Sequence, residues 1–171
     1  MKKRITEVLG IDVLPNYWDK RYVKNLDKLS RPKYEVELHS DVWLTLRDGT
    51  RMCTDVYLPK GAGKVPALVS WSAYSKEMQG LKRGAIPPES LVFDHSLEAG
   101  DIDYFVSRGY AYIIPDPRGI GKSEGEWYGT YNPQEHLDTY DLIEWCAEQD
   151  WCDENVGMIG YSYFGICQIL A

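Results

Sequence analysis

The chain has 171 residues, of which 44% are hydrophobic and 26% are charged. This composition is typical of one globular domain and excludes a disordered, collagen-like or coiled-coil chain. The formal net charge is −7, with three basic and fifteen acidic residues in the portion 94–171. Because an acidic surface repels phosphate, we expect no nucleic-acid partner for this half of the chain.

The cysteines and the apolar segments argue against a metal site, a disulfide framework, a membrane span and a signal peptide. No CxxC pair and no histidine at ligand spacing accompany the cysteines, so we expect no metal, and they do not form a disulfide framework. The cysteines are Cys53, Cys146, Cys152 and Cys167. No apolar run approaches the roughly 18 residues that cross a bilayer, and the N-terminal stretch does not match a signal peptide. We therefore expect a cytoplasmic protein without membrane contact or cofactor, and the oligomeric state stays open.

Residues 1–33 differ in character from the rest of the chain. They carry nine basic and four acidic residues, with aromatic side chains such as Tyr17 and Trp18 between the charges. A nucleic-acid-binding arm is one interpretation, but the interleaved acids and aromatics favour a helical or irregular lead-in that packs on the body of the protein. We therefore divide the chain into a lead-in, 1–33, and one domain, 34–171.

Apolar side chains alternate along residues 42–46 and again along residues 50–56. The two stripes share a face only if three residues connect them, which pairs Leu46 with Thr50. This spacing predicts an antiparallel hairpin with a bulge and with Gly49 at positive φ.

Solid apolar runs replace the alternation further along the chain, at residues 66–71, 110–114 and 156–161. Such runs are typical of parallel strands that are covered on both faces. Helices are expected between them, one at 101–108 and one that begins at Asn132 with a cap, a first-turn proline and a capping-box glutamate. The second helix is expected to face the sheet with one apolar stripe: Leu137, Tyr140, Ile143, Cys146 and Ala147. The order of elements predicts an α/β fold with a largely parallel sheet.

Two further segments raise the question of a functional role. The connection from Tyr74 to Asp101 has the length of a lid or binding loop, but its lone His95 is interpreted as solvated or structural. Residues 119–123, Gly-Ile-Gly-Lys-Ser, lack the earlier glycine of a phosphate loop and the third glycine of a dinucleotide fingerprint. We interpret residues 116–119 as a tight strand exit in which Arg118 pairs with a carboxylate.

Residues 160–165, Gly-Tyr-Ser-Tyr-Phe-Gly, lie between an apolar strand and an apolar helical segment. A nucleophile elbow requires this order, because the serine takes a strained backbone that holds its hydroxyl clear of the sheet. The helix N-terminus also directs N–H groups to the place where an acyl oxyanion develops. The general motif Gly-x-Ser-x-Gly is not met, since Phe164 holds its last position and Gly165 follows. The alternative is a serine that only caps a helix.

Several segments together carry a resemblance. They are residues 47–50 with 55–59, 74–76, 116–119 with 123–125, 141–145 and 160–165. These motifs resemble the X-prolyl dipeptidyl-peptidase and cocaine-esterase family of α/β-hydrolases, whose own elbow is Gly-x-Ser-Tyr-x-Gly. The resemblance covers roughly residues 34–171. It implies the N-terminal half of the α/β-hydrolase fold, in which an antiparallel hairpin leads into a mostly parallel sheet with helices on both faces.

The resemblance implies catalytic roles for three residues. Ser162 would be the nucleophile, and the oxyanion donors would be the main-chain N–H of Tyr163 and the phenol of Tyr74. The implied activity is that of a serine hydrolase acting through an acyl-enzyme on a small-molecule ester or a short peptide, as an X-Pro dipeptidyl-peptidase does. For Tyr74, the alternative is an aromatic side chain that only packs against the base of the long connection.

The chain departs from the family in the order of its catalytic residues. The family order is serine, aspartate, histidine, but the nine residues after Ser162 contain no Asp, Glu or His. The three histidines precede the serine, and we interpret His39 as a turn residue and His136 as a surface residue. We therefore expect a truncated portion of a longer hydrolase with little activity alone. A noncatalytic relic of the fold and an acyltransferase stay open as alternatives.

Overall fold

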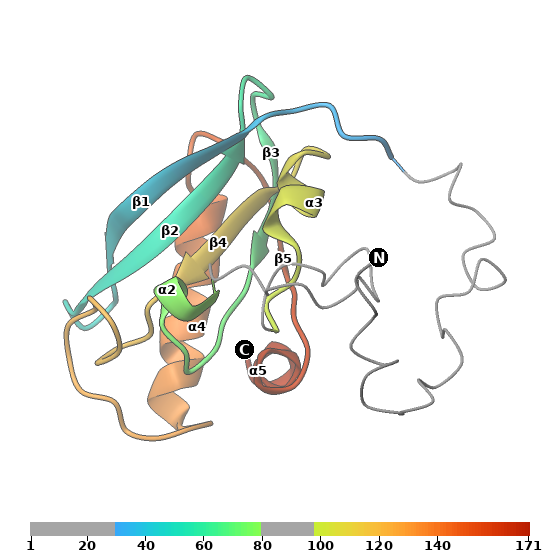
Figure 1. The fold of residues 1–171 in the computed structure, drawn as a ribbon. Coiled ribbons are helices and arrows are strands. Elements are labelled where there is room, and N and C mark those ends of the chain that lie inside the picture. Colours follow the sequence, from blue (N-terminus) through green and yellow to red (C-terminus); the bar gives the residue numbers. More distant parts are fainter. Residues whose placement is uncertain (1–29, 80–97) are drawn as a thin grey trace, which may run out of the picture.

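The computed structural model describes residues 30–79 and 98–171, and Figure 1 shows the fold. The described elements, in chain order, are β1 (Val36–Thr45), β2 (Arg51–Pro59), β3 (Val65–Val69), α2 (Lys76–Gln79), α3 (Ile102–Val106), β4 (Ala111–Pro115), α4 (Pro133–Ala147), β5 (Cys152–Met158) and α5 (Tyr163–Leu170). None of these helices is long and apolar enough to cross a membrane.

The strands form one mixed sheet in the order β1-β2-β4-β3-β5. β1 pairs with β2 and β2 with β4 in antiparallel fashion, whereas β3 lies parallel to both β4 and β5. The expected α/β-hydrolase arrangement, an antiparallel hairpin followed by a parallel sheet, is confirmed.

Helices cover both faces of this sheet. Neighbouring residues of a strand point to opposite faces, and on β4 Ile113 belongs to an apolar cluster that includes Leu142 of α4 and Cys167 of α5. The next side chain, Tyr112, belongs to a separate cluster with Val106 of α3. The two crossovers therefore place α3 on one face and α4 on the other, and α5, which follows β5, lies on the same face as α4 (Figure 1).

The predicted hairpin register is confirmed. Leu46 N–H donates to the Thr50 carbonyl at 2.9 Å across a three-residue connection, and Gly49 has a φ of 89°. The sequence pattern did not reveal a second irregularity. The β1–β2 register shifts between His39 and Val42, where Asp41 adopts a φ of 56°.

The last strand begins earlier than predicted. We expected it at residues 156–161, whereas β5 is Cys152–Met158. The first half of β5 is polar and contains Glu154 at a φ of 71°. The pairing of β3 with β5 shifts register in this part of the strand. β5 is the outer strand of this sheet, so much of it is exposed and it does not need a solid apolar run.

The predicted apolar stripe of α4 is wrong in its first half and confirmed further along, where Cys146 is buried and Ile143 packs against the core. Leu137 and Tyr140 are 41% and 50% exposed, respectively. The buried side chains of α4 include polar ones, and they are Glu135, Asp138, Thr139, Leu142 and Cys146. The helix is rotated from the expected face because the buried carboxylates have partners inside the protein, which a hydrophobic pattern cannot show.

Candidate active site

Ser162 lies at a sharp turn between β5 and α5. It immediately precedes the first helical residue, Tyr163, with φ 58° and ψ −124°, and its side chain makes no capping hydrogen bond. A positive φ is strained for a residue with a Cβ atom. The residue is exposed, so the turn presents its hydroxyl to solvent rather than using it to cap the helix.

Gly160 makes this turn possible. Its φ is 129°, and a Cβ built on it would lie 2.3 Å from the Cβ of Phe164 and 3.0 Å from the carbonyl oxygen of Glu98. Any side chain at this position would therefore collide with the first turn of α5. The absence of a side chain lets the end of the strand pass close to the helix.

The main-chain N–H of Tyr163 is available at the start of α5. The hydrogen bonds of the helix begin with Ile166 N–H, which donates to the Ser162 carbonyl at 3.1 Å. The N–H of Tyr163 lies before that bond, and it donates no hydrogen bond within the described residues. A free N–H at a helix N-terminus favours a negative charge in front of it.

Tyr74 approaches the same turn from the end of β3. Its ring centroid lies 6.3 Å from that of Tyr163 and 6.2 Å from that of Phe164, and the residue is 36% exposed. β3 and β5 are parallel neighbours, so their carboxyl ends meet at one edge of the sheet, where open α/β sheets bind ligands. The structure thus brings Tyr74 to the turn that carries Ser162 and Tyr163.

A buried carboxylate lies beneath the turn. Glu135 is 3% exposed, and its Oε1 accepts hydrogen bonds from Trp71 Nε1 at 3.0 Å and from the Tyr163 hydroxyl at 2.8 Å. Its Oε2 accepts from the Tyr131 N–H at 2.7 Å. Burial and the bond to this carboxylate raise the pKa of the Tyr163 phenol well above its ordinary value.

The sequence pattern predicted a different role for Glu135, that of a capping-box residue. The expected cap is present, because Asn132 Oδ1 accepts from the Glu135 N–H at 3.0 Å. The carboxylate does not return to the Asn132 N–H as a capping box requires. It turns into the protein, and no spacing in the sequence pointed to its partners.

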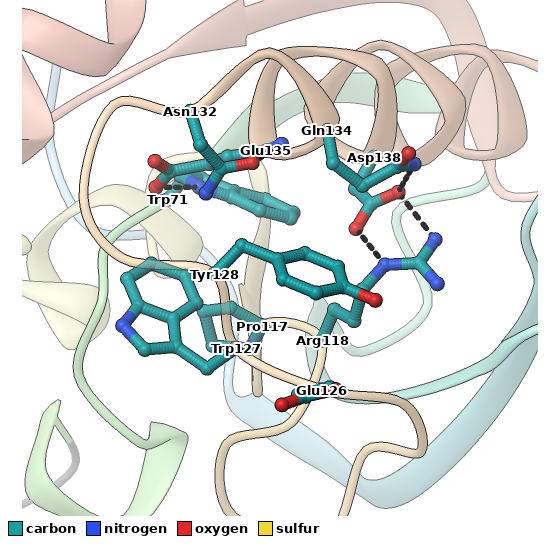
Figure 2. A pocket seen from close by; sticks show the side chains of 10 residues that line it. All are labelled: Trp71, Pro117, Arg118, Glu126, Trp127, Tyr128, Asn132, Gln134, Glu135 and Asp138. Carbon is teal, nitrogen blue, oxygen red and sulfur yellow. Dashed lines mark hydrogen bonds and ion pairs between the residues drawn. The ribbon is translucent and has the colours of Figure 1, made fainter.

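The wall of a small pocket includes the other side of Glu135 (Figure 2). Arg118 donates from Nε and Nη2 to the two carboxylate oxygens of Asp138 at 2.7 and 2.8 Å, and its Nη1 lies 2.9 Å from Asp48. These hydrogen bonds, led by the bond to Asp138, raise the pKa of the guanidinium. The prediction that Arg118 pairs with a carboxylate is confirmed.

A second ion cluster anchors the segment that follows Tyr74. The Lys76 ammonium, 3% exposed, lies 2.8 Å from Asp41 and 2.9 Å from Asp55. Lys122 reaches Asp41 at 2.7 Å, and the hydrogen bonds from Lys122 and Lys76 lower the pKa of Asp41. Asp116 joins the same two segments, since its oxygens accept from the Lys76 and Lys122 N–H groups at 2.8 and 2.9 Å. This cluster escaped the sequence analysis because its members are far apart in the chain.

The histidines lie apart from these interactions. His39 is part of strand β1 rather than a turn as predicted, and its Nε2 lies 3.7 Å from a carboxylate oxygen of Glu37. His136 is half-buried rather than a surface residue as predicted, and its Nε2 makes no hydrogen bond within the described parts of the chain. His95 lies outside the described residues. Within residues 30–79 and 98–171, no cluster of His, Cys, Asp and Glu could hold a metal ion.

Comparison with known proteins gives a consistent result. Residues 48–171 match the family model described as X-Pro dipeptidyl-peptidase, S15 family. The chain is 37% identical to the cocaine esterase of Rhodococcus sp. strain MB1 Bresler over 129 residues, which cover 75% of this chain and 20% of that protein.

Solved structures agree with the fold. A CocE/NonD family hydrolase from Staphylococcus aureus superimposes with a TM-score of 0.63 and 30% identity, covering 78% of this chain and 24% of that one. An alpha-amino acid ester hydrolase superimposes with a TM-score of 0.61 and 29% identity, covering 92% and 26%, respectively. The chain therefore spans about a fifth to a quarter of the length of these relatives.

Proposed function

The chain belongs to the X-Pro dipeptidyl-peptidase (S15) family, and from this premise we propose that Ser162 is the nucleophile of a serine hydrolase that cleaves acyl esters or amides. The observation that carries the proposal is the backbone of Ser162, φ 58° and ψ −124°, between a parallel strand and a helix. A serine that only capped the helix would have an extended backbone and a side-chain bond to the first turn. Ser162 has neither.

The proposed reaction has two steps. The Oγ of Ser162 attacks the acyl carbon, and the tetrahedral oxyanion collapses, which breaks the bond to the alcohol or amine and leaves an acyl-enzyme. Water then attacks the acyl carbon and releases Ser162. In both steps the oxyanion would accept hydrogen bonds from the Tyr163 N–H and the Tyr74 hydroxyl, which approach from neighbouring strand ends.

The proton of Ser162 requires a base. All three histidines precede Ser162 in the chain, against the order serine, aspartate, histidine that α/β-hydrolases follow. We propose that the histidine and its carboxylate are contributed by catalytic-domain residues outside these 171. The chain alone should then hydrolyse esters hardly faster than buffer, since a serine at its ordinary pKa is a poor nucleophile.

Hydrolysis of p-nitrophenyl acetate by a form of the chain extended through the rest of the catalytic domain tests the proposal. Ser162→Ala should abolish turnover. Tyr74→Phe should lower kcat by about 10²- to 10³-fold, which is the usual effect of removing one oxyanion donor. Full activity of the Ser162→Ala variant would refute the assignment. An unchanged kcat in Tyr74→Phe would favour the packing role for that ring.

Two alternative functions would give different results in the same assay with p-nitrophenyl acetate. An acyltransferase would transfer the acetyl group to an added alcohol or amine faster than to water. A noncatalytic relic of the fold would leave the ester intact. The names of the relatives, a cocaine esterase and an alpha-amino acid ester hydrolase, favour hydrolysis of a small ester. The family description, X-Pro dipeptidyl-peptidase, favours a short peptide.

A further inference from the structure

Glu135 has no part in the reaction described above. We propose that it is a positioning residue that fixes both proposed oxyanion donors, the N–H of Tyr163 and the hydroxyl of Tyr74. The inference rests on the proposed function, because it assigns Glu135 to the same site.

The carboxylate of Glu135 joins three segments of the chain. Its hydrogen-bond donors are the indole of Trp71 just after β3, the N–H of Tyr131 in the connection before α4, and two groups of α5, the hydroxyl of Tyr163 and the more distant thiol of Cys167. Figure 2 shows the carboxylate beside the Trp71 indole. One buried side chain therefore sets the distance between the end of β3 and the start of α5, which are the two elements that carry the donors.

The charge of Glu135 cannot be its contribution to catalysis. A carboxylate opposes a nearby oxyanion, and the four groups that donate to Glu135 (the Trp71 indole, the Tyr131 N–H, the Tyr163 hydroxyl and the Cys167 thiol) are all neutral. No lysine or arginine within the described residues forms an ion pair with it, because Arg118 in the adjoining pocket pairs with Asp138 and Asp48. What Glu135 provides is acceptor capacity, since two carboxylate oxygens can accept several bonds and a glutamine has one acceptor oxygen.

The contacts lead from Glu135 to both donors. The Tyr163 ring is held at its hydroxyl by Glu135 and on its face by Tyr131, which stacks at 4.6 Å and 19°. The main chain of the same residue carries the N–H that follows Ser162. The Tyr74 ring packs on this fixed Tyr163 ring at 6.3 Å, so loss of the Glu135 bonds should loosen both donors together.

NMR of the 171-residue chain, with ¹⁵N- and ¹³C-labelled tyrosine, tests the positioning directly. In Glu135→Gln, the amide signal of Tyr163 and the ring signals of Tyr74 should shift or broaden, while those of Tyr112 in the other apolar cluster stay in place. Asp138→Asn is the matched control, because Asp138 is a buried carboxylate on the same helix that binds Arg118 instead. Unchanged Tyr163 and Tyr74 signals in folded Glu135→Gln would overturn the proposal.

A double-mutant cycle in the extended form tests whether Glu135 acts through Tyr163. The rate at which a fluorophosphonate modifies Ser162 should fall about tenfold in Glu135→Gln, as expected for the loss of a hydrogen bond to a charged group. It should fall similarly in Tyr163→Phe, with little further loss when the two are combined. Effects that multiply independently would overturn the proposal.

The NMR experiment and the fluorophosphonate experiment distinguish a failure of the role of Glu135 from a failure of the proposed function of Ser162. If Ser162 of the unsubstituted extended form does not react at all, the proposed function fails, and the NMR signals still decide what Glu135 positions. If Glu135→Gln does not fold, Tyr163→Phe carries the NMR test, because it keeps the ring and removes only the hydroxyl. Tyr74 signals that stay in place in Tyr163→Phe would then contradict the proposed coupling.

Discussion

Single residues at this site hold conformations that their neighbours enforce. Ser162 has a positive φ although it has a Cβ atom. Gly160 also has a positive φ, and in addition a Cβ atom at its position would strike Phe164. Gly49 in the hairpin also has a positive φ, but nothing lies within 4 Å of the place its Cβ would take. A side chain at Gly49 would therefore cause backbone strain alone, whereas a side chain at Gly160 would cause backbone strain and a collision.

Gly160→Ala should destabilise the chain far more than Gly49→Ala. The hairpin variant pays only the strain of a left-handed alanine, about 1 to 2 kcal/mol. The Gly160 variant adds overpacking against Phe164, so a total loss of about 3 kcal/mol or more is expected. Urea unfolding of both variants measures the difference, and equal midpoints would show that α5 moves aside without cost.

Asp41 makes the stability depend on pH. The bonds from Lys122 and Lys76 lower its pKa in the folded chain below the ordinary value of 3.8. Its contribution is therefore present above pH 3.8 and is lost as the pH falls through the folded pKa. Asp41→Asn is a suitable change, because asparagine tolerates the φ of 56° at this position.

We expect Asp41→Asn to be less stable than the unsubstituted chain at pH 7 and the two to converge in acid. Urea midpoints between pH 7 and pH 2 measure this. A difference that stays constant down to pH 2 would mean that the ion cluster around Asp41 does not form in solution.

At the scale of elements, the sequence predicted strands and helix ends correctly where apolar side chains alternate regularly or where capping residues stand at fixed positions. The three-residue hairpin connection followed from two alternating stripes, and the start of α4 followed from Asn132 and Pro133. It failed where polar side chains are buried by partners distant in the chain. Glu135 and Asp138 rotate α4 because Trp71, Tyr163 and Arg118 satisfy them.

Two arginines outside α4 form ion pairs with aspartates of this helix, and we expect them to differ in their contribution to the free energy of unfolding. Arg118 binds Asp138, whose side chain is 2% exposed, whereas Arg47 binds Asp141 from a side chain that is 45% exposed. Removing one partner of a buried pair leaves an unpaired charge inside the protein. Exposed pairs contribute little because water screens them.

Arg118→Met should therefore cost about 3 to 5 kcal/mol of unfolding free energy, and Arg47→Met should cost much less. Both variants are compared by thermal and urea unfolding. A loss in Arg47→Met that equals the loss in Arg118→Met would contradict the role assigned to burial.

At the scale of the molecule, the fold brings the residues of the proposed site together at one edge of the sheet. The strand and helix around residues 160–165 indicated the turn that carries Ser162, and the family resemblance implied the roles of Ser162, Tyr163 and Tyr74. The supports of the site were not predictable in the same way. Glu135 beneath Tyr163, and the ions that hold Lys76 just after Tyr74, become neighbours only when the sheet and α4 have assembled.

The central claim is that Ser162 is a nucleophile, and covalent labelling tests it most directly. The extended form of the chain is treated with a fluorophosphonate, digested and analysed by peptide mass spectrometry. We predict one adduct, on the peptide that contains Ser162, and its loss in Ser162→Ala. An unmodified Ser162 peptide in a folded extended form would contradict the claim, and the strained turn would then serve only to pack β5 against α5.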